Sequence, residues 1–109
     1  MPHIFFVSLP VFVVAVVLSG MAQPGDAVER GKQTFMRVGC YQCHGREAQG
    51  ASTGPRLGPN PLPLAAFTRA IRTPRNEMPP YSVKLLADGE LADVYAFVAA
   101  RPRPHELPR

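Results

Sequence analysis

The sequence predicts a small all-α domain in which three main helices are joined by long loops rich in glycine and proline. Two observations indicate this class. Apolar residues recur at three- and four-residue spacing in three separate segments, as on one face of a helix. The chain also has 13 prolines and 9 glycines among its 109 residues. The longest proline-rich stretch, residues 45–63, has no strand periodicity and is therefore predicted to be a loop.

The first helix is predicted to begin after Asp26, which would act as its N-cap. Glu29 follows three residues later, as in a capping box. The helix would run through Val28, Lys32, Phe35 and Met36 to about residue 38. Gly39 is expected to end it.

The second helix is predicted over residues 64–73 and the third over residues 88–100. Pro74 and Pro102 close them, because proline cannot continue a helix. The expected buried stripe of the second helix is Leu64, Phe67, Ala70 and Ile71. That of the third helix is Leu91, Val94, Tyr95 and Val98.

A Cys-x-x-Cys-His motif at residues 40–44 is the main functional signal in the chain. This spacing is typical of covalent c-type haem attachment. Cys40 and Cys43 straddle one turn, so both sulfurs can reach the vinyl groups along one edge of a porphyrin. His44 would then lie beneath the ring and bind iron. The motif therefore predicts one haem c, attached through both cysteines, and redox chemistry at its iron.

The cysteine pair has three other possible interpretations. A thioredoxin-type motif needs a strand before a helix, which is missing here. A structural zinc site needs four ligands, and only His3 and His105 remain as further nitrogen donors. A disulfide between the two thiols would leave His44 without a role.

The N-terminal residues predict export. Residues 4–18 are almost wholly apolar, and Gly20 and Ala22 are small enough for cleavage after residue 22. A run of about 15 residues fits a signal peptide and is shorter than the roughly 20 residues that span a bilayer. Residues 1–22 are thus expected to be a signal peptide or, alternatively, an uncleaved anchor, with the domain in the periplasm.

The remaining chain is long enough for one small domain, residues 23–100, followed by a flexible Pro/Arg-rich tail at residues 101–109. A domain of this size buries little apolar surface, and a haem would supply much of its core. We therefore expect the apoprotein to be poorly folded. The formal charge of +4 favours docking to an acidic protein partner. Nucleic-acid binding is not expected, because no basic run has interleaved aromatics.

Met78 is the expected second iron ligand. It lies in a loop and is followed by Pro79 and Pro80, which restrict the local backbone. Met36 is assigned to packing on the first helix. Iron bound by His and Met makes a high-potential electron-transfer centre.

With these residues in place the chain resembles the class I cytochromes c, in particular the small bacterial, periplasmic monohaem type. The motifs that carry the resemblance are the Cys-x-x-Cys-His-Gly segment, Gly-Pro-Arg-Leu at residues 54–57, Met-Pro-Pro-Tyr at residues 78–81 and the third helix. It covers residues 26–100. It implies a cytochrome c fold wrapped around one haem.

The resemblance also implies roles for single residues. The first and last helices should cross where Gly31 meets Tyr95 or its neighbour Val94. The carbonyl of Pro55 should accept a hydrogen bond from the proximal histidine, which strengthens its donation to iron. Leu57 should pack on the haem.

The haem propionates have no Trp partner in this chain. Arginines are the expected substitutes, since a guanidinium pairs well with a carboxylate. Arg56 is the first candidate, and Arg69, Arg72 and Arg75 are the others. Tyr81 is expected to reach the haem or to plug the core.

The expected function is single-electron transfer between periplasmic or membrane redox partners, with no catalysis. The partner would be a dehydrogenase, an oxidase or a cytochrome complex, docked by charge, with Lys32, Arg37 and Lys84 as candidate rim residues. Membrane contact is expected only if the leader stays uncleaved. Two alternatives remain: a dedicated haem subunit of a dehydrogenase or oxidase complex, and a haem sensor with a displaceable Met78.

Overall fold

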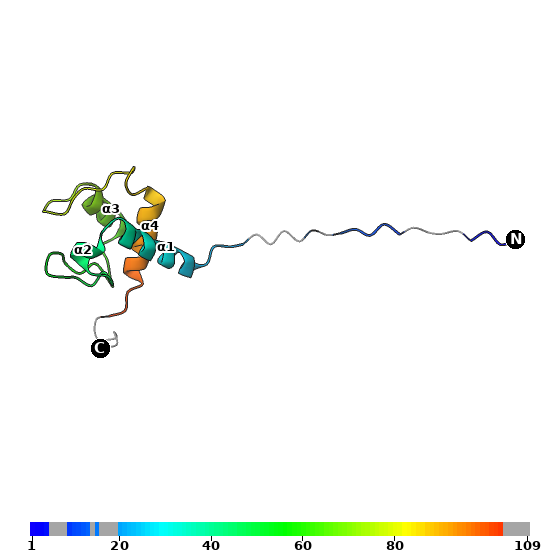
Figure 1. Ribbon diagram of the computed structural model, residues 1–109, viewed down its shortest axis with the longest axis horizontal. Helices are drawn as coiled ribbons and strands as arrows, with labels where there is room; N and C mark the ends of the chain where they lie inside the picture. The colour runs from blue at the N-terminus through cyan, green and yellow to red at the C-terminus, as the bar shows by residue number, and fades with distance from the viewer. Residues whose placement is uncertain (5–8, 14, 16–19, 104–109) are drawn as a thin grey trace.

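The computed structural model describes residues 1–4, 9–13, 15 and 20–103 of the chain. Within them it has four helices and no strand (Figure 1). The helices are α1 (Pro24–Arg37), α2 (Tyr41–His44), α3 (Leu64–Arg72) and α4 (Asp88–Ala99). The predicted all-α class is therefore confirmed.

The predicted leader is described only in part. Its residues 5–8, 14 and 16–19 lie outside the described residues, as do residues 104–109 of the predicted tail. The described residues before Pro24 belong to no helix or strand and run away from the helices in Figure 1. None of the helices in the described part of the chain has the length and apolar character needed to cross a membrane.

Helix α1 begins earlier than predicted, and Asp26 is not its N-cap. Gln23 is the N-cap and Pro24 is the first helical residue, a position where the missing N–H of proline costs nothing. The Asp26 carboxylate instead accepts a hydrogen bond from the backbone N–H of Gln23 at 3.3 Å. The acidic residue therefore still stabilises the helix start, but from its third position.

The end of α1 fixes the position of the cysteine motif that follows it. Gly39 has a φ of +89°, as predicted for the residue that stops the helix. The backbone N–H of Gly39 donates to the Met36 carbonyl at 3.3 Å, and that of Cys40 donates to the Phe35 carbonyl at 3.1 Å. This pair of bonds is a Schellman motif, and it fixes Cys40 relative to the axis of α1.

Helices α1 and α4 cross at Gly31. A Cβ atom at this position would lie 1.9 Å from the Asp93 carbonyl oxygen and 2.9 Å from Phe97 Cβ. The expected close approach at Gly31 is present, but the aromatic partner is Phe97 and not Tyr95 or Val94. The exposed ion pair between Arg30 and Asp93, at 2.8 Å, lies beside the crossing.

Phe35 and Phe97 form the centre of the core, with ring centroids 5.2 Å apart. Both are fully buried. The predicted stripe of α4 is right for Leu91, Val94 and Val98, which are all buried. It is wrong for Phe97, which it omitted.

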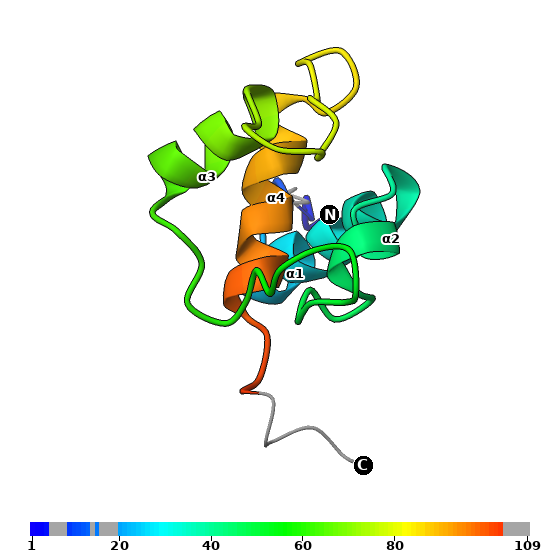
Figure 2. The same cartoon turned by 90° about the vertical axis from the view of Figure 1, so that its left-hand side faces the viewer.

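Tyr95 is only partly buried and has a different task. Its ring packs edge-on against Phe67 of α3 with centroids 5.1 Å apart. Its hydroxyl donates to the Leu62 carbonyl at 3.0 Å. Tyr95 therefore fastens α3 and the loop before it to α4, and Figure 2 shows α3 on one side of α4 with α2 on the other.

The packed domain extends past residue 100, where the flexible tail was predicted to begin. Arg101 donates to the Phe97 carbonyl at 2.9 Å and to the Glu47 carboxylate at 2.6 Å. Its guanidinium lies 3.9 Å from the centroid of the Phe97 ring. Gln49 donates to the carbonyl of Pro102 at 2.7 Å. These contacts bind the start of the tail to the loop that follows α2.

Candidate functional site

His44, at the end of α2, is held in one orientation by the chain itself. Its side chain is buried, with 7% exposed. Its Nδ1 lies 2.8 Å from the Pro55 carbonyl oxygen. Because a carbonyl can only accept, Nδ1 carries the proton and the lone pair of Nε2 is left for another partner.

The loop after His44 folds back to make this contact. The Ala48 carbonyl accepts hydrogen bonds from the backbone N–H groups of Leu57 and Gly58, at 2.9 and 3.1 Å. Gly54 passes so close that a Cβ atom there would lie 2.4 Å from the Cys43 carbonyl oxygen. The absence of a side chain at Gly54 thus lets the next residue, Pro55, reach the imidazole.

A cavity of about 290 Å³ lies above His44, between α2, α3 and the loops that follow them. Its lining is mostly apolar. The lining residues are Phe35, Cys40, His44, Pro55, Arg56, Leu57, Asn60, Leu62, Phe67, Ala70, Ile71, Met78, Tyr81, Leu86 and Val94. The structure therefore brings seven of the eight site residues that the sequence predicted into one cavity, and the eighth, Cys43, lies on the adjoining turn of α2.

A second cavity of about 520 Å³ shares lining residues with the first. His44, Leu62 and Met78 line both. The combined space fits a flat apolar ligand whose polar edge faces the second cavity, where Arg69, Arg75 and Asn76 are among the lining residues. A large macrocycle with an apolar body and an acidic edge has this shape and chemistry.

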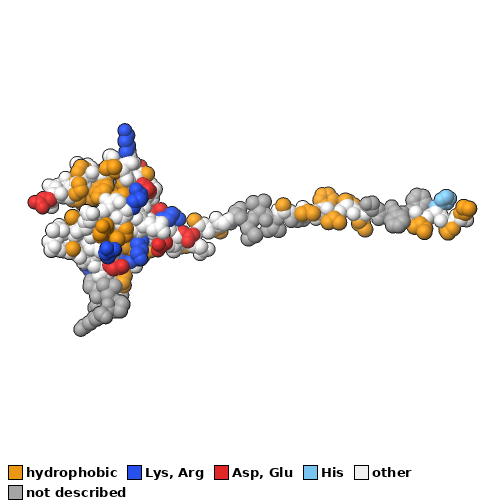
Figure 3. Space-filling view, viewed as in Figure 1, with side chains coloured by type: hydrophobic (Ala, Val, Ile, Leu, Met, Phe, Trp, Pro, Cys, Tyr) orange, Lys and Arg blue, Asp and Glu red, His pale blue; other side chains and the backbone are white. Residues whose placement is uncertain are grey.

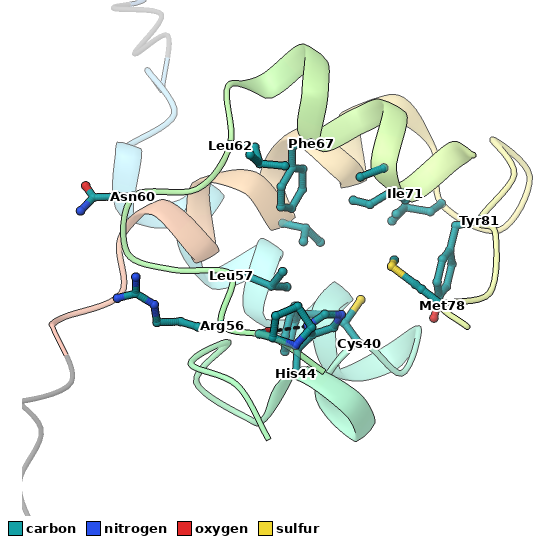
Figure 4. A pocket seen from close by; sticks show the side chains of 15 residues that line it. Cys40, His44, Arg56, Leu57, Asn60, Leu62, Phe67, Ile71, Met78 and Tyr81 are labelled. Atoms are coloured by element: carbon teal, nitrogen blue, oxygen red, sulfur yellow. Dashed lines mark hydrogen bonds between the residues drawn. The ribbon is translucent and has the colours of Figure 1, made fainter. Parts of the chain in front are cut away.

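Met78 and His44 reach into the cavity from different walls. Figure 4 shows the sulfur of Met78 directed into the space above the imidazole of His44. Met78 comes from the loop between α3 and α4, and His44 from α2. Met36 lines neither cavity and packs against the hydrophobic core, as its assignment to packing predicts.

Tyr81 lines the cavity beside Met78. Its hydroxyl donates to the Val38 carbonyl, at the end of α1, at 2.8 Å. Burial raises the pKa of Tyr81, and the neighbouring thiols of Cys40 and Cys43 contribute to the increase. The phenol is therefore a neutral hydrogen-bond donor at neutral pH.

The two cysteines lie one turn apart and are both free thiols. Cys40 is half-buried and lines the cavity, whereas Cys43 is exposed. Burial raises the pKa of the Cys40 thiol to about 11. The part of the chain that the structure describes has no cluster of three or more His, Cys, Asp or Glu side chains that could hold a metal ion.

The candidate arginines are placed differently from one another. Arg56 lines the cavity with part of its side chain, but Figure 4 shows its guanidinium turned outward. Arg69 and Arg75 line the second cavity. Arg72 lines neither, because it donates hydrogen bonds to the carbonyls of Tyr81 and Leu86. The expectation that Arg72 could serve as a propionate partner is therefore wrong.

Several lining residues were missed as site residues by the sequence analysis. Phe67, Ala70 and Ile71 were predicted only as the apolar face of a helix. Leu62 has a usable signal, since it is an apolar residue between prolines in a polar loop. Leu86 has none, because it follows Leu85 directly and the sequence does not show which of the two leucines is buried.

The surface charges are mixed. In Figure 3 basic and acidic side chains alternate over α1 and α4 on the visible face. Arg37, a candidate rim residue, is exposed and forms an ion pair with Glu90 across these two helices. Lys32 and Lys84 are exposed.

Comparison with known proteins identifies a family. No curated protein and no solved structure matches the chain. Residues 26–98 match the family of the cytochrome c oxidase, cbb3-type, subunit III. The match spans the cysteine motif, the cavity and Met78. The chain belongs to this family of c-type cytochromes, in which haem c serves electron transfer.

Proposed function

We propose that the chain is a monohaem c-type cytochrome that carries single electrons through an iron held by His44 and Met78. The haem would be attached by thioether bonds to Cys40 and Cys43. The observation that carries the proposal is that His44 and Met78 line one apolar cavity and reach into it from different walls. A haem iron with these two ligands exchanges one electron with a partner and has no open position for a substrate.

The residues around the cavity would orient the His44 ligand and exclude water from the iron. Pro55 accepts the Nδ1–H of His44, which sets the ring orientation and makes Nε2 a stronger donor. Leu57, Phe67 and Ile71 keep water away from the centre of the cavity. An apolar environment penalises the additional positive charge of ferric iron and so raises the reduction potential.

Cys43 marks the proposed route for the electron. It is exposed, while Cys40 lines the cavity, so the attached edge of a haem would lie at the surface there. A brief encounter with a redox partner at this edge needs only a small contact area. Basic and acidic side chains alternate on α1 and α4 (Figure 3), so we place the docking contact at the Cys43 edge and not on the face formed by these two helices.

We further propose that the domain acts on the periplasmic side of the membrane. The apolar residues 4–18 and the small residues after them support an export signal. Haem attachment to such a motif takes place after export in bacteria, so the two features agree. Whether residues 1–22 are removed or kept as an anchor decides between a free carrier and a membrane-bound one.

A dedicated oxidase subunit is the second candidate. The family description names a subunit of a cytochrome c oxidase, and this favours a lasting complex over a free carrier. If the full chain co-purifies with a membrane oxidase through solubilisation and gel filtration, it is a subunit of that oxidase. Elution of the haem protein alone supports the carrier.

Carbon monoxide binding tests the proposal. The full chain is purified with its haem attached, reduced and exposed to the gas, with Met78→Ala as the positive control. We expect the measured mass of the purified chain to exceed that of the polypeptide by one haem. The reduced natural protein should not bind carbon monoxide, whereas the reduced Met78→Ala variant should bind it rapidly. Free uptake by the natural protein would overturn the carrier and favour a haem sensor.

A further inference from the structure

The loop that presents Met78 has few attachments of its own. It spans residues 73–87, between α3 and α4. The backbone N–H of Tyr81 donates to the Ile71 carbonyl of α3 at 3.1 Å. The Ser82 carbonyl accepts hydrogen bonds from the backbone N–H groups of Leu85 and Leu86, at 3.1 and 3.0 Å. The position of Met78 therefore depends on how the segment that begins at Tyr81 is held.

Arg72, the last residue of α3, holds that segment at both of its ends. Its Nη1 group donates to the Tyr81 carbonyl at 3.0 Å and to the Leu86 carbonyl at 2.7 Å. Its side chain is only 18% exposed. A guanidinium suits this task, because its donors are fixed in one plane and it stays charged at every accessible pH.

The same guanidinium also reaches α4. Its Nη2 group lies 2.7 Å from a carboxylate oxygen of Asp88. Asp88 is 84% exposed, so this ion pair is screened by water and contributes little. The two bonds to backbone carbonyls are therefore the main part of the Arg72 contact.

Tyr81 connects this arrangement to the opposite wall of the cavity. Its backbone is held by Ile71 and Arg72, and its hydroxyl donates to the Val38 carbonyl at 2.8 Å. Val38 lies two residues before Cys40, where the motif that carries His44 begins. One chain of hydrogen bonds thus joins the wall with Met78 to the wall with His44.

We propose that Arg72 is a positioning residue that keeps the sulfur of Met78 at the iron, and that it acts through the backbone of residues 81–86. The inference rests on the proposed His44 and Met78 ligation. Loss of the two carbonyl bonds would let the loop move away from His44. The Met78 thioether would then compete less well with other ligands for ferric iron, because ferric iron binds a thioether more weakly than ferrous iron does.

The test is a titration of the ferric holoprotein with imidazole, which competes with Met78 for iron. The far-red absorption band given by Met bound to ferric iron is followed at the same time. We expect Arg72→Ala to bind imidazole at least about tenfold more tightly than the natural chain, the effect of losing one charged hydrogen bond. Asp88→Asn should stay close to the natural affinity.

Arg30→Ala is the matched control, because it removes another ion-paired arginine that joins two helices away from the loop. Its imidazole affinity should not change. If Arg72→Ala yields no folded holoprotein, the titration is made on Arg72→Lys, which keeps the charge but lacks the planar fork and should also gain affinity.

Natural affinity in the Arg72 variant, or an equal gain in Arg30→Ala, would overturn the role of Arg72. A natural protein that lacks the far-red band would overturn the ligation itself, and the Arg72 proposal with it. The band in the natural chain therefore separates the two failures.

Discussion

The contact between His44 and Pro55 depends on a residue with no side chain. Gly54 crosses the Cys43 carbonyl so closely that no Cβ atom fits. A shift of that backbone would move Pro55, whose carbonyl oxygen lies 2.8 Å from His44 Nδ1. The orientation of the imidazole is therefore set by backbone packing within residues 43–55.

Replacement of Gly54 by Ala should destabilise the holoprotein. The new Cβ atom would lie 2.4 Å from a backbone oxygen, and overpacking of this kind costs about 1–3 kcal/mol. Chemical denaturation of the purified protein measures the loss. Thr53→Ala at the exposed neighbour is the control and should stay within about 0.5 kcal/mol. Equal stability of the two variants would show that the loop yields easily.

Single residues of the site were predictable where the signal is local. The cysteines and His44 lie within five consecutive positions, and Met78 is marked by the prolines that follow it. The contacts of Arg72 are not predictable from the sequence, because its partners are backbone carbonyls nine and fourteen residues away. A sequence does not show which carbonyls a long side chain can reach.

The helices place these residues through two contacts. Helices α1 and α4 cross at Gly31, and α3 packs against α4 through the rings of Phe67 and Tyr95. The Schellman motif at the end of α1 then directs Cys40 toward the cavity. A change in the distance between α1 and α4 would therefore move the wall that carries His44.

Gly31→Ala should separate these two helices. Its Cβ atom would lie 1.9 Å from the Asp93 carbonyl oxygen, so we expect a loss of about 2 kcal/mol or more, in spite of the higher helix propensity of alanine. Gly25→Ala is the control on the same helix, where a Cβ atom meets nothing within 4 Å. Thermal unfolding followed by helical circular dichroism compares them. A Gly31→Ala protein as stable as Gly25→Ala contradicts the crossing.

Helix positions were predicted well where the apolar period and a proline agree. The bounds of α3 and α4 differ from the expected ones by a single residue. The start of α1 was wrong, because both Asp26 and the Gln23–Pro24 pair are good start signals and local sequence does not rank them. Phe97 was omitted because α4 is apolar over most of its circumference, so its sequence leaves the phase of the buried stripe open.

The molecule as a whole is a small helical frame around a cavity. Its described core has nine buried apolar residues, and long loops close the remaining sides. Arg101 ties the end of α4 to the loop after α2 through Glu47 and the ring of Phe97. The loop that carries Pro55 is therefore supported from the C-terminal side as well.

Arg101→Ala should loosen this support. Its side chain is 13% exposed, so its contacts are partly shielded from water and together contribute about 2 kcal/mol. Lys84→Ala, which removes the same charge from an exposed position, is the control and should have little effect. The denaturant midpoints of the two holoproteins measure the difference in stability. Equal midpoints would mean that Arg101 contributes no net stability.

The central claim is that Met78 binds the iron opposite His44, and the far-red band of the ferric protein tests it most directly. Spectra are recorded for the natural chain and for Met78→Ala, with Met36→Ala as the control. We predict the band in the natural protein and in Met36→Ala, and its loss in Met78→Ala alone. A band that survives in Met78→Ala, or that is missing from the natural protein, would contradict the account.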